Sequence, residues 1–546
     1  MSLNLQEFKL KSKNIILILS GVIIFGYIIR LYFFPYDLPL AQDAFLYFTY
    51  GIDTMILGEL PKAFTIPNNG WPIILSGIFP FFNFDTAIEL MTVQRFTSIT
   101  FSVFTIIPIY FISRKFFNPI LSILCCFIFV FEPRLIENSL LGLTEPIYIF
   151  LITSSLALFL SEREKVTYFS FWIISFAAMI RYEAMILLIP FSIIFLFRFR
   201  KSGKKIILKY FIIILIFILL ILPVAYVRHS STGQDGFTQV VIGPKYVINT
   251  SISSPTESDH KSIFKFFTDG MINLVKYLGW SSIPTFILFL PLGIIIMLKK
   301  LDYKKSTLLL ISLFLLLPAF YAYSRNIQEL RYLLPIYPLL CIASIFFLDY
   351  IRRKIPYHKT ILIFVFSGII ISSVMFLDYN LPNYENERES LDAARYIFQN
   401  TDLVNDFYQP TAEKLVFMKL DQTTYPTLSI DSALRKNLTP EWPSGKLITL
   451  YNNPDVKITK LPNKIPDIQF DSVEEYLKFT KNLGLTHIVS DGNTSNPKIL
   501  NDVFFNEHNY PYLIKEFDSK NLGYTYYHTK VFKIDYKIFD YYLLNE

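Results

Sequence analysis

Apolar residues gather along this chain in runs that are long enough to cross a lipid bilayer. The run at Ile15 reads IILILSGVIIFGYIIRLYFF, and the run at Phe211 reads FIIILIFILLILPVAYV. A helix needs about 20 residues to cross the hydrocarbon core, so the pattern predicts a polytopic α-helical membrane protein with about eleven transmembrane helices. The predicted spans are residues 14–34, 86–112, 118–132, 140–160, 166–181, 184–198, 206–227, 275–298, 306–323, 330–350 and 360–378.

The connections between these runs differ in charge in an alternating way. Basic residues gather before the first run and in the connections that begin near Ser113, Ser161, Arg198, Leu298 and Ile351. The intervening connections at 35–85, 133–139, 228–274 and 324–329 carry few basic residues for their length. Lys and Arg accumulate on the cytoplasmic side of membrane proteins. We therefore expect a multi-pass plasma-membrane protein with a cytoplasmic N-terminus and everything after residue 378 outside.

Composition agrees with this assignment. The chain is 53% hydrophobic and only 17% charged, which is not the composition of a soluble protein. The formal net charge of +7 then reflects topology and anionic lipid, and we expect no nucleic-acid partner. Cys125, Cys126 and Cys341 lie inside apolar runs, where they are expected to act as small packing residues.

Hydrophobicity falls after about residue 384, and the pattern becomes that of a small α/β domain. We expect a transmembrane domain at 1–380 and an extracytoplasmic soluble domain at 385–546. In DSVEEYLKFTKNLGLTHIVSDG, Ser472 and Glu475 form a capping box, Gly484 is placed to end the helix, and THIVS is the next strand.

The rest of this C-terminal region shows the same alternation. RESLDAARYIFQN has helical spacing, LVNDF followed by TAEKLVFMKL is typical of a strand and then a helix, and YLIKEFDSKNLGYTYYHTKVFKI indicates a hairpin. Such alternation favours a mostly parallel sheet with helices on its faces. No glycine-rich phosphate loop follows any of these strands, so an accessory or acceptor-recognition role is the better expectation.

Asp43 is the first candidate for chemistry, because it follows the first run and stands among aromatic residues. A carboxylate at membrane level beside Phe45, Tyr47 and Tyr50 is partly desolvated, which raises its basicity and suits it to take a proton from an attacking hydroxyl. The alternative is that Asp43 only caps an interfacial helix. The loop alone does not decide between the two.

Two further acids and an arginine stand near the outer ends of later runs. LLGLTEPIYIF places Glu145 a few residues into the fourth run, and an acid there is usually functional or paired. The alternative places it at the outer end of the helix, with Pro146 in the first turn. Arg181 and Glu183 lie at the next outer turn, where they solvate the turn or pair with Glu145.

Arg331 stands with Tyr332 in RNIQELRYLLPIYPLL, at the outer entrance of the tenth run. The planar fork of an arginine donates two hydrogen bonds to a phosphate while keeping its charge. A snorkelling anchor is the alternative for arginines at this depth. Trp71, in NNGWPIILSGIF, is most simply an interfacial anchor. Taken together, the residue types favour an outward-facing cleft at bilayer depth for a substrate that is both lipid and phosphate.

The order of these motifs resembles that of the GT-C fold glycosyltransferases. The likeness rests on an acid in a long first outside loop, NGWPIIL, LTEPIYIFL, IRYEAMILL and ELRYLLPIYPLL, and it covers roughly residues 14–378. The chain looks most like the branch with protein O-mannosyltransferases and the lipid A aminoarabinose transferase. The resemblance implies an inverting transferase that takes a sugar from a dolichyl or undecaprenyl phosphate and gives it to a hydroxyl of a protein, lipid or glycan.

The resemblance also implies roles for single residues. Asp43 matches the first-loop acid that serves as the catalytic base. Arg331, with Arg181, would stabilise the leaving phosphate. Glu145 and Glu183 would orient the sugar, the acceptor or those arginines. Tyr332 belongs to the Arg331 motif and would contact the substrate.

The first loop departs from the family pattern in one respect. Many relatives have two neighbouring acids there, whereas Asp43 stands between Gln42 and Ala44. No metal ligand is therefore assigned, and the use of a divalent cation such as Mg²⁺ or Mn²⁺ stays open. The Asp-x-Asp of the oligosaccharyltransferases is missing from this loop, so transfer of a whole oligosaccharide to asparagine is not expected.

Two other kinds of function compete with the enzyme. A polytopic transporter also buries Arg and Glu, but transporters commonly show internal repeats, and the two halves of this sequence show no convincing repeat. A non-catalytic subunit of an envelope-assembly complex is the second alternative, and it requires Asp43 to be dispensable.

Overall fold

The computed structural model describes most of the membrane region and parts of the C-terminal region. It covers residues 12–40, 42–60, 66, 68–82, 87–200, 203, 205–238, 240–243, 263–380, 470–481, 487–491, 498–525 and 528–545. The described residues fall into two compact units, and each unit is described by itself. The first lies within Met1–Phe34, Phe64–Ile74 and Gln94–Leu381, and the second within Pro35–Ala63, Leu75–Val93 and Pro382–Glu546.

The described part of the chain before residue 381 is helical. Its α-helices are α1 (Ser12–Tyr32), α2 (Gln42–Leu57), α3 (Gly70–Ile78), α4 (Ala87–Phe104), α5 (Ile106–Ser113), α6 (Pro119–Val130), α7 (Pro133–Leu140), α8 (Glu145–Phe159), α9 (Glu164–Ile180), α10 (Leu188–Arg198), α11 (Lys205–Thr232), α13 (Ile263–Ser281), α14 (Leu290–Leu298), α15 (Tyr303–Ser324), α16 (Tyr337–Lys354) and α17 (His358–Asn380). Its 3₁₀ helices are η1 (Phe79–Phe81), η2 (Tyr182–Leu187) and η4 (Leu330–Ile336).

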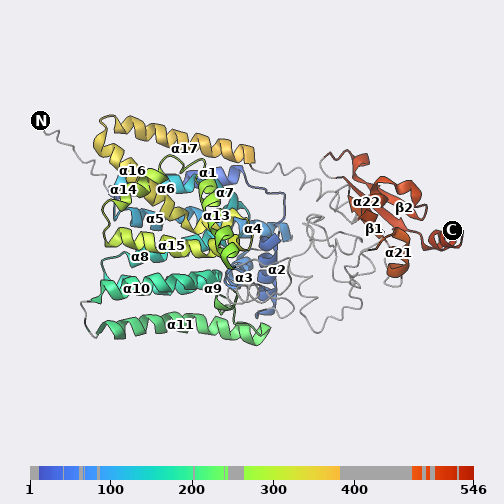
Figure 1. Ribbon diagram of the computed structural model, residues 1–546, viewed down its shortest axis with the longest axis horizontal. Helices are drawn as coiled ribbons and strands as arrows, with labels where there is room; N and C mark the ends of the chain where they lie inside the picture. Colours follow the sequence, from blue (N-terminus) through green and yellow to red (C-terminus); the bar gives the residue numbers. More distant parts are fainter. Residues whose placement is uncertain are drawn as a thin grey trace. The chain divides into compact units, whose positions relative to one another are not determined.

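Several of these helices are long and apolar enough to span a bilayer. Among the described residues six pass this test, and the number is seven if α6 and α7, bent by 51°, count as one broken span. In the first unit, α10, α11, α15 and α17 run in a common direction, and α13 runs across it (Figure 1). The expected polytopic helical membrane protein is therefore confirmed.

The difference from the predicted eleven spans has a local cause. Several predicted runs are interrupted, because proline and 3₁₀ turns break the α-helical hydrogen-bond ladder. The run predicted at 184–198 is divided between η2 and α10, and the run at 275–298 is divided between α13 and α14. The helix predicted at 140–160 begins only at Glu145 and has 15 residues.

The core of the first unit is closely packed. Cys125, Cys126 and Cys341 are free thiols buried in it, as expected of packing residues. The guanidinium of Arg95, which is 5% exposed, lies 5.9 Å from the centre of the Phe34 ring. Phe34 belongs to an apolar cluster of buried side chains. Its other buried members are Ile99, Val103 and Leu140, and the partly buried Ile23, Tyr27, Phe33 and Phe96 pack against it.

Gly293 lets α14 approach α16 closely. A Cβ at this position would lie 2.1 Å from the carbonyl oxygen of Ala343 and 3.1 Å from the Cα of Ser344. Backbone atoms cannot rotate away, so Gly293→Ala is expected to separate the helices and to destabilise the protein by about 1–3 kcal/mol. The thermal unfolding midpoint of the purified chain in detergent measures this loss.

Gly368→Ala is the matched control, because no heavy atom lies within 4 Å of a Cβ built there. That substitution is expected to be neutral or to add up to about 1 kcal/mol through helix propensity. Equal midpoints for the two variants would contradict the close approach of α14 and α16.

The second unit holds α2 and the C-terminal elements. Within it, the Phe48 ring of α2 meets the Phe79 ring of η1 edge-on, with centroids 5.6 Å apart. The described C-terminal elements are α21 (Val473–Lys481), β1 (His487–Asp491), α22 (Lys498–Phe505), η6 (Glu507–Asn509), β2 (Leu513–Asp518), η7 (Ser519–Leu522), β3 (Thr529–Ile534) and α23 (Tyr536–Asn545).

The sheet of the C-terminal region corrects one expectation. The described strands have the order β1-β3-β2, and both pairings are antiparallel, so the expected mostly parallel sheet is wrong for these strands. The expected hairpin is present as β2 and β3. The Ser472 hydroxyl accepts a hydrogen bond from the Glu475 backbone N–H at 3.1 Å, which confirms half of the capping box. Gly484 and the elements expected between 385 and 469 lie outside the described residues.

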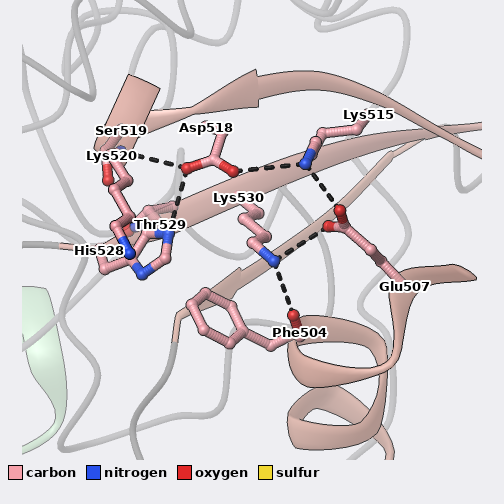
Figure 2. A network of polar contacts seen from close by, with 9 residues as sticks. All are labelled: Phe504, Glu507, Lys515, Asp518, Ser519, Lys520, His528, Thr529 and Lys530. Atoms are coloured by element: carbon pink, nitrogen blue, oxygen red, sulfur yellow. Dashed lines mark hydrogen bonds and ion pairs between the residues drawn. The ribbon is translucent and has the colours of Figure 1, made fainter. Parts of the chain in front are cut away.

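Hydrogen bonds and ion pairs between polar side chains connect β2, β3 and the residues after α22 (Figure 2). The Lys515 ammonium lies 2.7 Å from a Glu507 carboxylate oxygen and 3.4 Å from Asp518. His528 Nε2 lies 3.1 Å from the other Asp518 oxygen. Lys530 donates to the Phe504 carbonyl at 2.8 Å and lies 3.0 Å from Glu507. These contacts join β2, β3 and the end of α22.

The same contacts predict how the C-terminal region responds to acid. Burial by itself would raise the pKa of Asp518 and Glu507, but hydrogen bonds from His528 and Lys515 outweigh it and hold both pKa values below their ordinary 3.8 and 4.5. A carboxyl whose folded-state pKa is depressed adds stability above its unfolded pKa and loses it as the pH falls through the folded one. Protection of the β2 and β3 amides should therefore be constant above about pH 5 and should fall below it.

Hydrogen exchange of the full chain, corrected for the intrinsic effect of pH on exchange, measures this protection. Asp518→Asn is expected to lower protection at neutral pH and to weaken its dependence on acid. A loss confined to pH 6–8 in the unaltered chain would contradict the role given to these carboxylates.

Candidate active site between η2 and η4

Glu145 lies at the start of α8 rather than inside it. The helix begins at this residue, and Pro146 occupies its first turn. This corrects the expectation that Glu145 stands a few residues into the run. The side chain is nonetheless only 1% exposed. A carboxylate buried to this degree needs a cationic partner, because an isolated charge is costly to bury.

Arg181 is that partner. It follows the last residue of α9 in an extended conformation, with φ −145° and ψ 117°. Its guanidinium donates to Glu145 at 2.6 Å and to Glu183 at 3.1 Å, so one arginine bridges two carboxylates. The second oxygen of each carboxylate, Oε2, is buried without a hydrogen-bond partner among the described residues. The sequence left open whether these residues pair or only solvate the turn, and here they pair.

The turn that carries Arg181 is held by the segment before α3. The Asn68 side chain accepts a hydrogen bond from the Tyr182 backbone N–H at 3.0 Å. Gly70 lies so close to this turn that a Cβ would meet the carbonyl oxygen of Met179 at 2.5 Å. Asn68 and Gly70 therefore fix the backbone from which the guanidinium projects.

Trp71 belongs to the same segment, and its expected role as an interfacial anchor is wrong. The ring is fully buried, and its Nε1 donates to the Gly142 carbonyl at 3.2 Å. Gln94 donates to the same carbonyl at 2.8 Å. Gly142 precedes α8 with φ +75°, a conformation that glycine adopts readily. Trp71 thus supports the turn that leads to Glu145.

Arg331 and Tyr332 come from η4, at the start of the candidate span Leu330–Lys354. The Arg331 guanidinium contacts the Glu329 carboxylate and lies 5.7 Å from the centre of the Tyr332 ring. A cavity separates this arginine from Arg181. The side chains that line it are Tyr148, Arg181, Glu183, Leu315, Pro318, Arg331, Tyr332 and Pro335. The structure therefore brings together four of the candidate residues around one cavity, with Glu145 behind Arg181.

Asp43 belongs to the second unit. Helix α2 begins at Gln42, so Asp43 lies in its first turn, where the helix dipole also favours a carboxylate. Its side chain is half-buried, whereas Ala44 and Phe48 on the same helix are buried. This position fits a catalytic base and also a residue that stabilises the helix end.

Sequence reasoning missed two residues of this site. The Tyr148 ring lies 5.7 Å from the Arg181 guanidinium and lines the cavity. It stands three residues after Glu145, so helical spacing from a known candidate could have identified it. Asn68 contributes one hydrogen bond, which its side chain accepts from the Tyr182 backbone N–H. Nothing in the sequence NNGWP indicates that Tyr182 is its partner.

The acids of this site do not form a recognisable metal centre. Among the described residues, no three His, Cys, Asp or Glu side chains lie close enough to hold a metal ion. Glu145 and Glu183 are engaged with Arg181, whose positive charge opposes a cation beside them.

The sequence matches one family model over part of its length. The Alg9-like mannosyltransferase family matches residues 276–405, a range that includes Arg331 and Tyr332. Among curated proteins, none matches the chain.

Solved structures resemble the chain over most of its length. The apo oligosaccharyltransferase from Archaeoglobus fulgidus aligns with a TM-score of 0.54 and 13% identity, covering 89% of this chain and 70% of that chain. The same protein in complex with Zn and sulfate aligns with a TM-score of 0.53 and 14% identity, covering 86% and 68%. ArnT from Cupriavidus metallidurans in the apo state aligns with a TM-score of 0.54 and 11% identity, covering 96% and 98%.

These similarities confirm the expected GT-C fold. Sequence identity of 11% to 14% shows a shared fold but does not identify the substrate. Together with the mannosyltransferase family match, the fold supports glycosyltransferase activity and does not favour the transporter or assembly-subunit alternatives.

Proposed function

We propose that this chain is a membrane glycosyltransferase that moves a sugar from a polyprenyl phosphate, dolichyl or undecaprenyl, to a hydroxyl group of a protein, lipid or glycan. The carrying observation is the cavity between η2 and η4, which Arg181 and Arg331 both line, and Arg331 stands at the start of the candidate span Leu330–Lys354. Two arginines beside a helix of membrane-spanning length suit a phosphate that is attached to a lipid. The transfer would occur on the outer face of the plasma membrane, with the N-terminus in the cytoplasm and residues 385–546 outside.

The chemistry of the donor assigns a role to each arginine. As the glycosidic bond to the phosphate breaks, negative charge builds on the departing phosphate oxygen. Arg331 and Arg181 would stabilise that charge, because fixed cations cost no reorganisation at the moment of reaction. Tyr332 and Tyr148, whose rings border the cavity, would exclude water from it.

Two carboxylate oxygens of the site are buried hydrogen-bond acceptors, and a sugar could supply the donors that they lack in the described part of the chain. Oε2 of Glu145 and Oε2 of Glu183 are buried acceptors with no donor among the described residues. A buried acceptor without a donor is costly, and sugar hydroxyls are donors. Glu183, which lines the cavity, would orient the sugar ring through its Oε2, while Glu145 would hold Arg181 in place.

Asp43 would complete the reaction as general base. The acceptor oxygen attacks the anomeric carbon from the face opposite the phosphate, its proton passes to the Asp43 carboxylate, and polyprenyl phosphate leaves. The configuration at the anomeric carbon is thereby inverted. No other charge or proton has to be supplied, because the base keeps the proton that the acceptor loses.

The test is transfer by the full chain in lipid vesicles. The chain is incubated with radiolabelled polyprenyl-phosphate mannose, glucose or aminoarabinose and with an envelope extract as acceptor. Label that moves to an extracted product only when the chain is present supports the proposal. Absence of transfer from every donor, with acceptor supplied, would contradict it.

A further inference from the structure

The short segment between α15 and η4 delivers a carboxylate to Arg331. Arg325 follows the end of α15, and Asn326 adopts φ +63°, which turns the chain sharply. Glu329 then precedes η4 in an extended conformation, and its carboxylate contacts the Arg331 guanidinium. Only Leu330 separates the two residues, so the ion pair is local in sequence.

The backbone of Glu329 is fixed, whereas its side chain is not. The buried Tyr323 hydroxyl donates to the Glu329 carbonyl at 3.1 Å, and the Tyr323 ring stacks on Tyr277 with centroids 4.9 Å apart. The Tyr277 hydroxyl in turn donates to the Gln328 side chain at 3.0 Å. The Glu329 side chain itself is 49% exposed. Its carboxylate can therefore rotate into water while the backbone stays in place.

Carboxylates already neutralise the two arginines at the cavity. Arg181 and Arg331 are two positive charges, and Glu145, Glu183 and Glu329 are three negative ones, so the five groups carry one net negative charge when ionised. A donor phosphate adds a further negative charge. Binding is favoured if one carboxylate moves away from its arginine.

Glu329 is the carboxylate that can leave at the lowest cost. Glu145 is 1% exposed and Glu183 is 16% exposed, and both share Arg181. The pair of Glu329 and Arg331 is far more exposed, and exposed ion pairs are weak. A phosphate accepts two hydrogen bonds from a guanidinium and replaces such a pair readily.

We propose that Glu329 competes with the donor phosphate for Arg331. Its carboxylate occupies the arginine when no donor is bound, and it turns into solvent when the phosphate arrives. This inference rests on the proposed function, because it takes Arg331 as a phosphate-binding residue. It assigns Glu329 a part in setting the affinity for the donor, while Glu145 and Glu183 remain on Arg181.

Binding of farnesyl phosphate, a short polyprenyl phosphate, to the purified full chain in detergent tests this inference. Glu329→Gln is expected to bind the probe about two- to fivefold more tightly, the range set by the strength of an exposed ion pair. Glu162→Gln is the matched control, because Glu162 is 81% exposed and its pair with Lys304 spans 3.7 Å. It makes the same change in charge away from the cavity, and it should leave the affinity unchanged.

The Arg331→Gln background separates competition from a general effect of charge. Arg331→Gln is expected to weaken binding, and Glu329→Gln should then have no further effect. Tighter binding that persists in this background, or unchanged or weaker binding by Glu329→Gln alone, would overturn the competition while leaving the proposed function in place. No binding by the unaltered chain, or full binding by Arg331→Gln, would overturn the phosphate role of Arg331 as well.

Discussion

Replacement of Asp43 by asparagine is expected to abolish sugar transfer while the protein remains folded. Asparagine has nearly the same shape as aspartate, but its amide cannot take a proton from the acceptor hydroxyl. General base catalysis contributes about 10²–10⁴-fold to a rate, so transfer should fall by about that factor. The initial rate of label transfer in vesicles, at equal amounts of folded protein, measures the loss.

Asp37→Asn is the matched control, because Asp37 lies shortly before α2 in the same segment and is exposed. The control should retain transfer close to that of the unaltered chain. If Asp43→Asn transfers sugar at an unchanged rate, the base lies elsewhere and the position of Asp43 in the first turn of α2 reflects helix stability alone.

The second large effect is expected at Arg181. Arg181→Met removes the cation between Glu145 and Glu183, so the buried Glu145 carboxylate and the partly buried Glu183 carboxylate both lose this partner. Loss of one partner from a buried ion pair destabilises a protein by about 3–5 kcal/mol. The variant should therefore unfold at a lower temperature in detergent and should also lose transfer.

A double variant separates the structural from the catalytic role of this arginine. Arg181→Met with Glu145→Leu replaces the buried pair by apolar side chains, and such replacements are often neutral for stability. Glu183, at 16% exposure, can turn toward water. We expect the unfolding temperature to recover while transfer stays lost. Recovery of both would contradict a role of Arg181 in phosphate binding.

The arrangement of the site explains why a local change should have these separate effects. Arg181 is placed by the turn after α9, which Asn68 and Gly70 hold through backbone contacts. Arg331 is placed by η4. The residue before this helix, Glu329, is held by a hydrogen bond from the Tyr323 hydroxyl to its backbone carbonyl. The two arginines are therefore supported independently, and a substitution at one should not displace the other.

Much of the membrane region could be predicted from the sequence alone. A hydrocarbon core requires long apolar helices, so runs such as the one at Ile15 identify spans without reference to any other part of the chain. Burial of the three cysteines, the hairpin of β2 and β3 and the cap at Ser472 follow from equally local signals. The order of short motifs was sufficient to indicate the GT-C fold, which the solved structures confirm.

What only the tertiary structure decided depends on distances between residues far apart in sequence. Arg181 and Glu145 are 36 residues apart, and no local pattern distinguishes an arginine that pairs with a buried glutamate from one that solvates a turn. Trp71 is buried and donates a hydrogen bond to the Gly142 carbonyl, far away in sequence, and β3 pairs with both β1 and β2 in antiparallel register. The sequence by itself determined which residue types stand near the ends of the apolar runs and in what order. Their partners were decided by packing, because a hydrogen bond or an ion pair forms only where the fold brings two groups within about 3 Å of each other.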